Sequence, residues 1–528
     1  MLDCIIRGAR IVDGTGSPWY RSDVAVKDGK IAKIAYHITE ETREVIEAED
    51  MILAPGFIDI HSHSDFSLPV TDLAESRLLQ GVTTEIGGNC GLSAAPVYPP
   101  RLEMLQKYVG FLTQDLKWDW VSFGEYLSAV RRAKLAVNFG CLVGHGTLRV
   151  AAMGFDDRTP TEAEMHQMKQ MLRESMEQGA FGFSSGLIYP PGCYSLPSEL
   201  SELAQVVVPF GGYYETHMRD EGDDLLASIE ESAEVGRIAK VPVLVAHHKV
   251  TGPTNWGKGA ESQQKISDFR VEGIDIVCDQ YPYTAASTTI TTIYPHWAHE
   301  GGVDGQIGRR IDGESRAKIR SEVLKRMNDS GRKFEDILIA AVGSEKNRHL
   351  EGLRVTEAAA LGGIEPIDFV IELVIEEKAS VAAVTFAMCE DDVKEIMKSP
   401  LTMIGSDGGS MPLVGPGKPH PRSFGTFVRV LAKYARDDGM FTFEEAVRKM
   451  TSLPAWRAKI FDRGLIRPGF WGDLVLINEV DLQETATYAN PRQAPKGIEK
   501  VWVNGVLAVD KGNMTEVRAG KVLTINGK

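Results

Sequence analysis

The sequence is poor in cysteine, in net positive charge and in long apolar runs. Six of its 528 residues are cysteine and no two form a CxxC pair, so we expect no disulfide framework and a reducing compartment. The net charge of -15 argues against a nucleic-acid partner, which needs a basic face. We find no run of about 18 apolar residues and no basic segment leading into an apolar stretch, so we expect neither a membrane span nor a secretory signal. These absences predict a cytoplasmic protein.

Short β-rich runs lie at both ends of the chain. Asp28-Gly29 is a hairpin signal in the first of these regions, and Asn504-Gly505 is another in the second. Because chain termini commonly lie close together, we predict that residues 1–54 and 462–528 form one small β-sandwich domain. Val522 to Ile525 is expected to supply its last strand. Two unrelated edge sheets are the alternative.

The middle of the chain, residues 55–461, alternates apolar strands with helical patterns, which predicts an α/β fold with parallel strands. Eight strands favour a closed, TIM-type (β/α)8 barrel. The strands are expected to begin at Phe57, Thr83, Val137, Phe181, Tyr213, Val243, Ile274 and Met403. The charge- and glycine-rich stretch 291–350, between the seventh and eighth strands, is expected to be an inserted subdomain or lid.

Polar residues collect directly after these strands. In a TIM barrel the carboxyl ends of the strands meet at one face, where active sites lie, so residues far apart in the sequence converge. His61 and His63 are two apart on an extended segment, so their side chains point to one side. The other groups that follow strands are Cys90, His145, His217, His247, His248 and Asp407.

The composition of this set predicts a zinc site. Imidazole and thiolate both suit zinc, and three protein ligands plus water make an open, catalytic geometry. Bound zinc can lower the pKa of water from 15.7 to about 7, which makes hydroxide available at neutral pH. His247 and His248 are adjacent and face opposite ways on a strand, so only one can be a ligand, and their spacing does not say which.

Each candidate also has a structural interpretation. Cys90 could be a small buried hydrophobe, although its loop, Gly87 to Gly91, suggests a close approach of the backbone to something bound. Asp407 precedes two glycines and could be an ordinary turn aspartate. His145 could simply tie loops together.

Longer motifs surround these residues in the order of the chain. They are Ala54 to His63, Gly88-Asn89-Cys90-Gly91, Ser185 to Gly192, His217-Met218-Arg219-Asp220-Glu221, His247-His248-Lys249, Ser406-Asp407-Gly408, His420-Pro421-Arg422 and Pro468 to Leu474. At these segments the chain resembles the N-acyl-D-amino-acid deacylase (D-aminoacylase) family of the amidohydrolase superfamily. The resemblance covers nearly the whole chain.

The resemblance implies a zinc ion held tightly by Cys90, His217 and His247, with His248 as the fallback for the third ligand. His61 and His63 then line a second metal position that is often weak or empty. The cysteine takes the place that a carboxylated lysine after the fourth strand holds in related cyclic amidases, and the fourth strand here has no lysine. Asp407 maps to the general base and acid. The residues implied to bind the substrate carboxylate are Lys249, Tyr281, Ser287 and Arg422.

The implied reaction is zinc-dependent hydrolysis of the amide bond of an N-acyl-D-amino acid. A dipeptidase that releases a C-terminal D-amino acid is the nearest alternative, followed by a cyclic amidase of the hydantoinase or dihydroorotase kind, which the missing lysine disfavours. A barrel without catalysis is a third alternative. The chain departs from the family at Ser64 and Asp65, where two acidic residues are common, and in a longer segment between Asp407 and Arg422. Both departures bear on specificity, and the sequence carries no signal for an oligomeric state.

Overall fold

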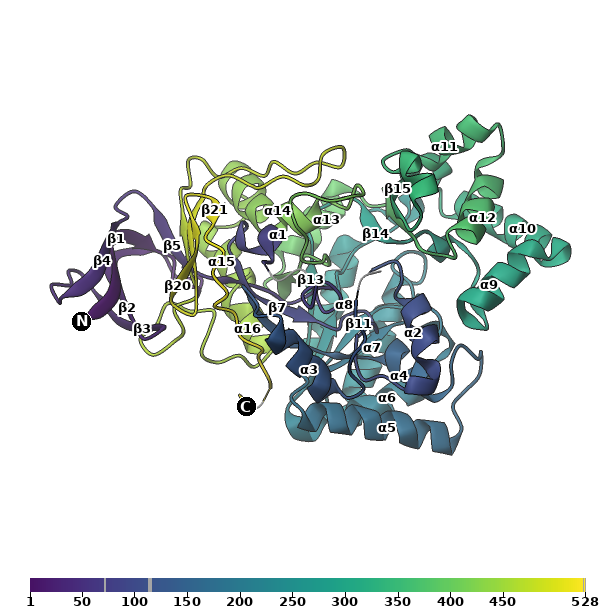
Figure 1. The fold of residues 1–528 in the computed structure, drawn as a ribbon, viewed down its shortest axis with the longest axis horizontal. Coiled ribbons are helices and arrows are strands. Elements are labelled where there is room, and N and C mark those ends of the chain that lie inside the picture. Colours follow the sequence, from purple (N-terminus) through teal and green to yellow (C-terminus); the bar gives the residue numbers. More distant parts are fainter. Residues whose placement is uncertain (71–72, 113–115, 526, 528) are drawn as a thin grey trace.

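The computed structural model describes residues 1–70, 73–112, 116–525 and 527. Parallel strands lie at the centre of the molecule (Figure 1), and their pairing closes them into a ring. β8 and β9 are separated by a single residue and together occupy one position in the ring. The strands of the described residues therefore fill eight positions. An isolated parallel bridge between Ser62 and Gly408 joins the first strand to the last. The strands are β6 (Phe57–Asp59), β7 (Val82–Gly87), β8 (Asn138–Cys141), β9 (Val143–Gly144), β10 (Gly182–Gly186), β11 (Tyr213–His217), β12 (Val243–Val245), β13 (Ile276–Gln280) and β17 (Thr402–Ile404). The predicted TIM-type barrel is confirmed.

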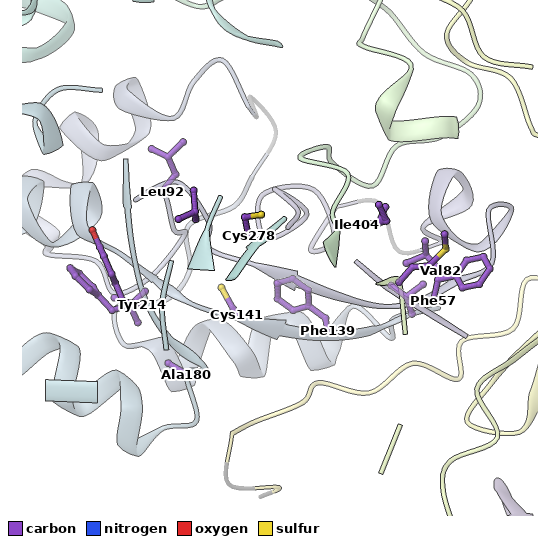
Figure 2. Packing of buried hydrophobic residues seen from close by; sticks show 14 of the residues in the cluster. Phe57, Val82, Leu92, Phe139, Cys141, Ala180, Tyr214, Cys278 and Ile404 are labelled. Carbon is purple, nitrogen blue, oxygen red and sulfur yellow. The ribbon is translucent and has the colours of Figure 1, made fainter. Parts of the chain in front are cut away.

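The barrel interior is filled by apolar side chains, one from each position around the ring. Successive residues of a strand face opposite ways, so alternate residues fill the interior and the rest face the helices. The interior set is Ile60, Ile86, Leu142, Phe181, Tyr213, Leu244, Val277 and Met403. Phe57, Val82 and Phe139 belong to the surrounding core that Figure 2 shows. Phe57 stacks on Phe427 with 5.9 Å between ring centroids, which fixes a helix against the first strand.

Helices follow most of the barrel strands and cover the ring. The sequence starts two of them with capping boxes, Ser122 with Glu125 and Thr161 with Glu164, in which side chain and backbone satisfy each other's free N–H groups. The helices of the barrel are α1 (Glu75–Leu78), α2 (Leu102–Tyr108), α3 (Phe123–Arg132), α4 (His145–Ala152), α5 (Glu162–Glu177), α6 (Pro197–Val207), α7 (Leu225–Ala239), α8 (Gly259–Val271), α13 (Glu390–Lys398), α14 (Arg422–Arg429), α15 (Phe443–Lys449) and α16 (Ser452–Arg457).

Both ends of the chain join in one sheet beside the barrel, at the left of Figure 1. β5 pairs antiparallel with β18, which links the N-terminal strands to the C-terminal ones. Asp28-Gly29 and Asn504-Gly505 both have positive φ at each residue, as a two-residue hairpin turn needs. The strands are β1 (Leu2–Ile11), β2 (Tyr20–Lys27), β3 (Lys30–Ala35), β4 (Thr42–Glu47), β5 (Ile52–Pro55), β18 (Leu474–Ile477), β19 (Ile498–Val503), β20 (Val506–Asp510) and β21 (Asn513–Met514). The predicted small β domain built from both termini is therefore confirmed.

The C-terminal segment lies elsewhere than predicted. Val522 to Ile525 does not extend the small sheet. Phe139 of β8 donates its N–H to Lys521 O and accepts from Leu523 N–H, so this segment runs along the barrel. Leu523 and Ile525 pack against the apolar layer that fills the barrel interior. The prediction was wrong because the β-rich pattern of Val522 to Ile525 can pack on any apolar surface. In this structure the apolar layer of the barrel provides that surface.

A separate unit with its own hydrophobic core is inserted between β13 and β17, at the right of Figure 1. Its strands pair antiparallel in the order β14–β16–β15, so residues about 100 apart in the sequence become neighbours. The packed unit runs from Ala286 to Thr385 and so extends beyond the expected range 291–350 at both ends. Its elements are β14 (Ala286–Thr289), α9 (Gly302–Ile311), α10 (Gly313–Asp329), β15 (Ile337–Val342), α11 (Val355–Gly362), α12 (Pro366–Glu376) and β16 (Val381–Thr385).

No helix in the described ranges combines the length and the apolar composition needed to cross a membrane.

Candidate active site

The barrel brings most of the predicted ligands together at the carboxyl ends of its strands. Cys90 Sγ lies 3.3 Å from His61 Nε2 and 3.4 Å from His247 Nε2. His217 Nδ1 lies 2.8 Å from His247 Nε2. Each of the four residues follows or ends a different strand, which explains why the sequence spreads them over 187 positions while the fold gathers them.

Asp407, which follows β17, completes the cluster. Its Oδ1 lies 3.1 Å from His63 Nε2 and 3.5 Å from His61 Nε2. Its Oδ2 accepts a 2.6 Å hydrogen bond from Arg422 Nη1. Asp407 is 6 % exposed, so this carboxylate is held among imidazoles and one guanidinium and is nearly shielded from water.

The donor atoms of this cluster fit a zinc ion. The four atoms offered by His61, Cys90, His247 and Asp407 all lie within 4.8 Å of one another, and those of His217, Glu221 and His247 do so as well. One thiolate with imidazoles and a carboxylate is a donor set that zinc accepts. His247 belongs to both groups, so it is the residue on which a metal in either position depends.

The backbone is strained at three of these residues. Cys90, His247 and Asp407 have φ values of 54°, 33° and 51°, although none of them is glycine. A positive φ is uncommon for residues with a Cβ atom, and such strain is found mainly where surrounding structure fixes a functional side chain. The turn interpretation of Asp407 is therefore incomplete, because its side chain is aimed into the cluster.

The glycine-rich loop at Cys90 approaches neighbouring backbone. A Cβ atom on Gly88 would lie 2.2 Å from Leu142 O, and one on Gly91 would lie 2.6 Å from Gly186 N. The sequence suggested an approach to something bound. The glycines instead let this loop pack against the next two strands, which places the Cys90 thiol at the cluster.

Carboxylates beneath the cluster orient its members. Asp279 Oδ1 accepts from His247 N–H at 3.0 Å and lies 3.2 Å from His61 Nδ1. Glu215 Oε2 accepts from Cys90 N–H at 3.0 Å. Neither Asp279 nor Glu215 was predicted from the sequence. The sequence does carry one signal for them, because each is an acidic residue within an apolar barrel strand. A buried carboxylate is costly without partners, so its presence there indicates that polar partners lie nearby.

Glu221 is a third carboxylate beside the cluster, and its sequence motif does not predict its role. Its Oε1 lies 3.0 Å from His247 Nδ1 and 2.6 Å from Lys249 Nζ. A metal-ligating histidine usually donates its other ring N–H to a carboxylate, which fixes the tautomer. Glu221 is placed to do this for His247 while it also neutralises Lys249.

His248 and His145 point away from the cluster. His248 Nε2 lies 2.8 Å from Ser262 Oγ, and burial lowers the pKa of His248 to about 4. His145 Nε2 lies 2.8 Å from Glu199 Oε1, and the same carboxylate accepts from Arg149. His145 thus takes part in a buried ion-pair network that joins helix α4 to helix α6.

Two cations and an aromatic hydroxyl converge beside Asp407. Lys249 Nζ and Arg422 Cζ lie 5.5 Å and 4.9 Å from the centroid of the Tyr281 ring. The Tyr281 hydroxyl is buried and has no hydrogen-bond partner among the residues that the structure describes. Arg422 Nη2 also donates to Ser287 O at 2.9 Å, so the four predicted carboxylate-binding residues lie in one place.

Burial and the nearby charges set the protonation of the cluster. Burial alone would raise the pKa of Asp407, but the guanidinium of Arg422 holds this pKa well below its usual range. Burial lowers the pKa values of His217 and His247 well below normal, so both imidazoles are neutral, as metal ligation requires. Burial also raises the pKa of Glu215 to about 8.

Comparison with known proteins agrees with this geometry. A model described as "Amidohydrolase family" matches residues 44–509. A D-aminoacylase of Alcaligenes xylosoxydans xylosoxydans is 34% identical over 99% of this chain and 97% of its own. A solved D-aminoacylase structure whose subject is a binuclear metal center is 33% identical, with a TM-score of 0.85 over 99% of this chain and 100% of that chain. The chain belongs to the D-aminoacylase family of amidohydrolases.

A second solved structure carries a mimic of a reaction intermediate. It is an N-acyl-D-glutamate deacylase of Bordetella bronchiseptica with zinc and a phosphonate inhibitor that mimics the tetrahedral intermediate. It is 33% identical to this chain, covers 99% of both chains and has a TM-score of 0.84. The family membership therefore extends over the barrel, the small β domain and the inserted unit alike.

Proposed function

We propose that this protein is a zinc-dependent deacylase that hydrolyses the amide bond of N-acyl-D-amino acids, with Asp407 as the group that moves the proton. The observation that carries the proposal is the position of Asp407. Its carboxylate touches the imidazoles of the cluster on one side and Arg422, beside the carboxylate-binding group, on the other. A D-aminoacylase and an N-acyl-D-glutamate deacylase align over nearly the whole chain, which supports this substrate class.

The ligand assignment is part of the proposal. Cys90, His217 and His247 would hold the tightly bound zinc, and His61 and His63 would line a second, weaker metal position. His247 is preferred to His248 because only His247 faces Cys90 and His217. Zinc in this site supplies a Lewis acid that polarises a carbonyl and makes water more acidic.

Asp407 acts as base and then as acid. Its low pKa keeps it ionised, so it accepts a proton from the attacking water, and the water oxygen bonds to the amide carbon. It then delivers that proton to the amide nitrogen as the carbon–nitrogen bond breaks. The products are a carboxylate from the acyl group and a free D-amino acid.

The carboxylate-binding group selects the substrate. Lys249 and Arg422 supply positive charge, Tyr281 supplies its free hydroxyl, and Ser287 lies on the neighbouring strand β14. An anionic substrate thus meets local cations inside a protein of net charge -15. Fixing the carboxylate, the carbonyl and the side chain gives three points around the α-carbon, which selects one enantiomer.

We also propose a cytoplasmic location, because the six cysteines are all free.

The first test is an amine-release assay on purified protein of measured metal content. The panel consists of N-acetyl-D-amino acids, their L-enantiomers and L-Xaa-D-Xaa dipeptides. We expect turnover of the N-acetyl-D-amino acids only, with about one zinc per chain. Faster turnover of the dipeptides would replace the deacylase assignment with the dipeptidase alternative. Turnover of the L-enantiomers at equal rates would contradict the proposed stereochemical selection.

A further inference from the structure

Two cavities meet at the cluster, and Asp407 lines both. One has a volume of about 170 Å³ and reaches His217 and Lys249. The other, also about 170 Å³, reaches His63 and Cys90. Tyr189, Ser287 and Thr288 line both cavities and form the partition between them, closed by a 2.8 Å hydrogen bond from Tyr189 to Thr288. A substrate whose reacting carbon lies at Asp407 therefore has one space for each half of the molecule.

The first cavity is charged. Apart from Lys249, its walls carry Arg219, Arg326 and Arg332, together with acidic residues of the segment that follows β11. The free hydroxyl of Tyr281 opens into the same cavity. The half of the substrate that bears a carboxylate belongs here, and Arg422 stands at the junction of the two cavities, where it donates to Asp407 and to Ser287 O.

The second cavity, which we call the acyl cavity, is apolar beyond the cluster. Leu92, Phe111 and Met411 line it from the barrel. Ala340, Ala341 and Ala382 line it from the inserted unit, where small side chains leave the space open.

The ionisable groups His63, Asp407 and Arg422, which line the acyl cavity, stand at its end nearest the cluster. Arg422 donates to Asp407 and to Ser287 O, and His420 Nε2 lies 2.9 Å from Ala285 O. A charged group placed deep in this cavity would lose its hydration without finding a partner, which is costly. An apolar group would gain by leaving water.

We propose that the acyl cavity holds the acyl chain and that the preferred substrates carry an apolar acyl group larger than acetyl. This inference rests on the deacylase function proposed above. An acetyl group leaves most of the cavity empty. An apolar cavity of roughly 150 Å³ accommodates a benzene-sized molecule, so a space of this size takes a chain of about four to six carbons or one aromatic ring.

The test is a chain-length series on one D-amino acid that the enzyme accepts, with acetyl, butyryl and hexanoyl as the acyl groups. Burial of each added CH₂ is worth about a fourfold gain, so we expect kcat/KM for the hexanoyl substrate to exceed that for acetyl by about tenfold or more. Equal kcat/KM across the series would overturn this inference and leave the deacylase function intact. Failure to hydrolyse any N-acyl-D-amino acid would overturn the proposed function and this inference with it.

A variant that fills the acyl cavity tests whether the residues lining it determine the preference for long acyl chains. Ala341 and Ala382 face each other across β15 and β16. We expect Ala382→Leu to lower the hexanoyl-to-acetyl ratio of kcat/KM to near one. Ala360→Leu makes the same change on an exposed helix of the inserted unit and is expected to keep the wild-type ratio. A wild-type ratio in Ala382→Leu would show that the chain binds elsewhere and would contradict the inference.

Discussion

At the scale of single residues, Asp407 is constrained from three directions. His63 and His61 approach one oxygen, Arg422 binds the other, and a positive φ fixes the main chain. We expect Asp407→Asn to lower kcat by about 10²- to 10⁴-fold, because an amide cannot accept the proton of water. The zinc content should stay near one per chain if Cys90, His217 and His247 hold the ion.

Metal analysis measures the zinc content of the Asp407→Asn variant, and steady-state kinetics measures its kcat. Asp438→Asn is the matched control, because Asp438 is exposed and pairs only with Lys394 among the described ion pairs. Full activity in Asp407→Asn would refute the proton-transfer role. Loss of zinc together with activity would make Asp407 a ligand instead.

Glu221 is predicted to act through His247. Glu221→Gln removes the negative charge that faces His247 Nδ1 and Lys249 Nζ. Loss of such an outer carboxylate typically costs 10- to 100-fold in metal affinity, so we expect the zinc Kd to rise by about that factor. Competition with a chelator of known affinity gives the Kd. Asp223→Asn, which changes a carboxylate bonded to Asn255 in the same cavity, should leave the Kd unchanged. An unaltered Kd in Glu221→Gln would show that Glu221 does not support the ligand.

At the scale of elements, a buried ionic group joins the small β domain to the barrel. Asp473, directly before β18, accepts from Arg463, from Asn138 of β8 and from the main-chain N–H of Asn504. Asp473 and Arg463 are both nearly buried. We expect Asp473→Ala to lower the free energy of unfolding by about 3–5 kcal/mol, since it strands a buried guanidinium.

The denaturant midpoint, followed by circular dichroism, measures this loss. The double variant Arg463→Met/Asp473→Ala removes both charges and should recover a large part of it. If the double variant were less stable than Asp473→Ala by a further several kcal/mol, the loss would come from packing and not from the stranded charge.

The elements also show what a sequence can and cannot predict. The barrel strands were found because each is a short apolar run, and the ligands because each follows such a run. Asp279 and Glu215 were missed because their partners, His61, His247 and Cys90, are brought to them only by closure of the ring. The inserted unit was drawn too short for a similar reason, since β14 becomes a strand by pairing with β16 about 100 residues later.

At the scale of the whole molecule, the candidate metal site ties together strands from around the barrel. Cys90 follows β7, His217 ends β11 and His247 follows β12, so a bound ion bridges segments that unfolding would separate. An ion that binds only the folded state stabilises it by RT ln(1 + [L]/Kd), or about 2.7 kcal/mol at 100 times the Kd. We therefore expect the melting temperature to fall on chelation and to rise again with the logarithm of added zinc.

Differential scanning calorimetry across a zinc titration measures this dependence. Stabilisation by a specifically bound ion continues to grow with the logarithm of the zinc concentration after the site is saturated. A logarithmic rise in melting temperature therefore distinguishes specific zinc binding from a nonspecific effect of salt. Cys90→Ser removes the thiolate and should flatten the rise, while Cys4→Ser, in the small β domain, should preserve it. A melting temperature that does not respond to zinc in the wild-type protein would mean that the cluster is not a metal site, and the hydrolytic mechanism built on it would fail as well.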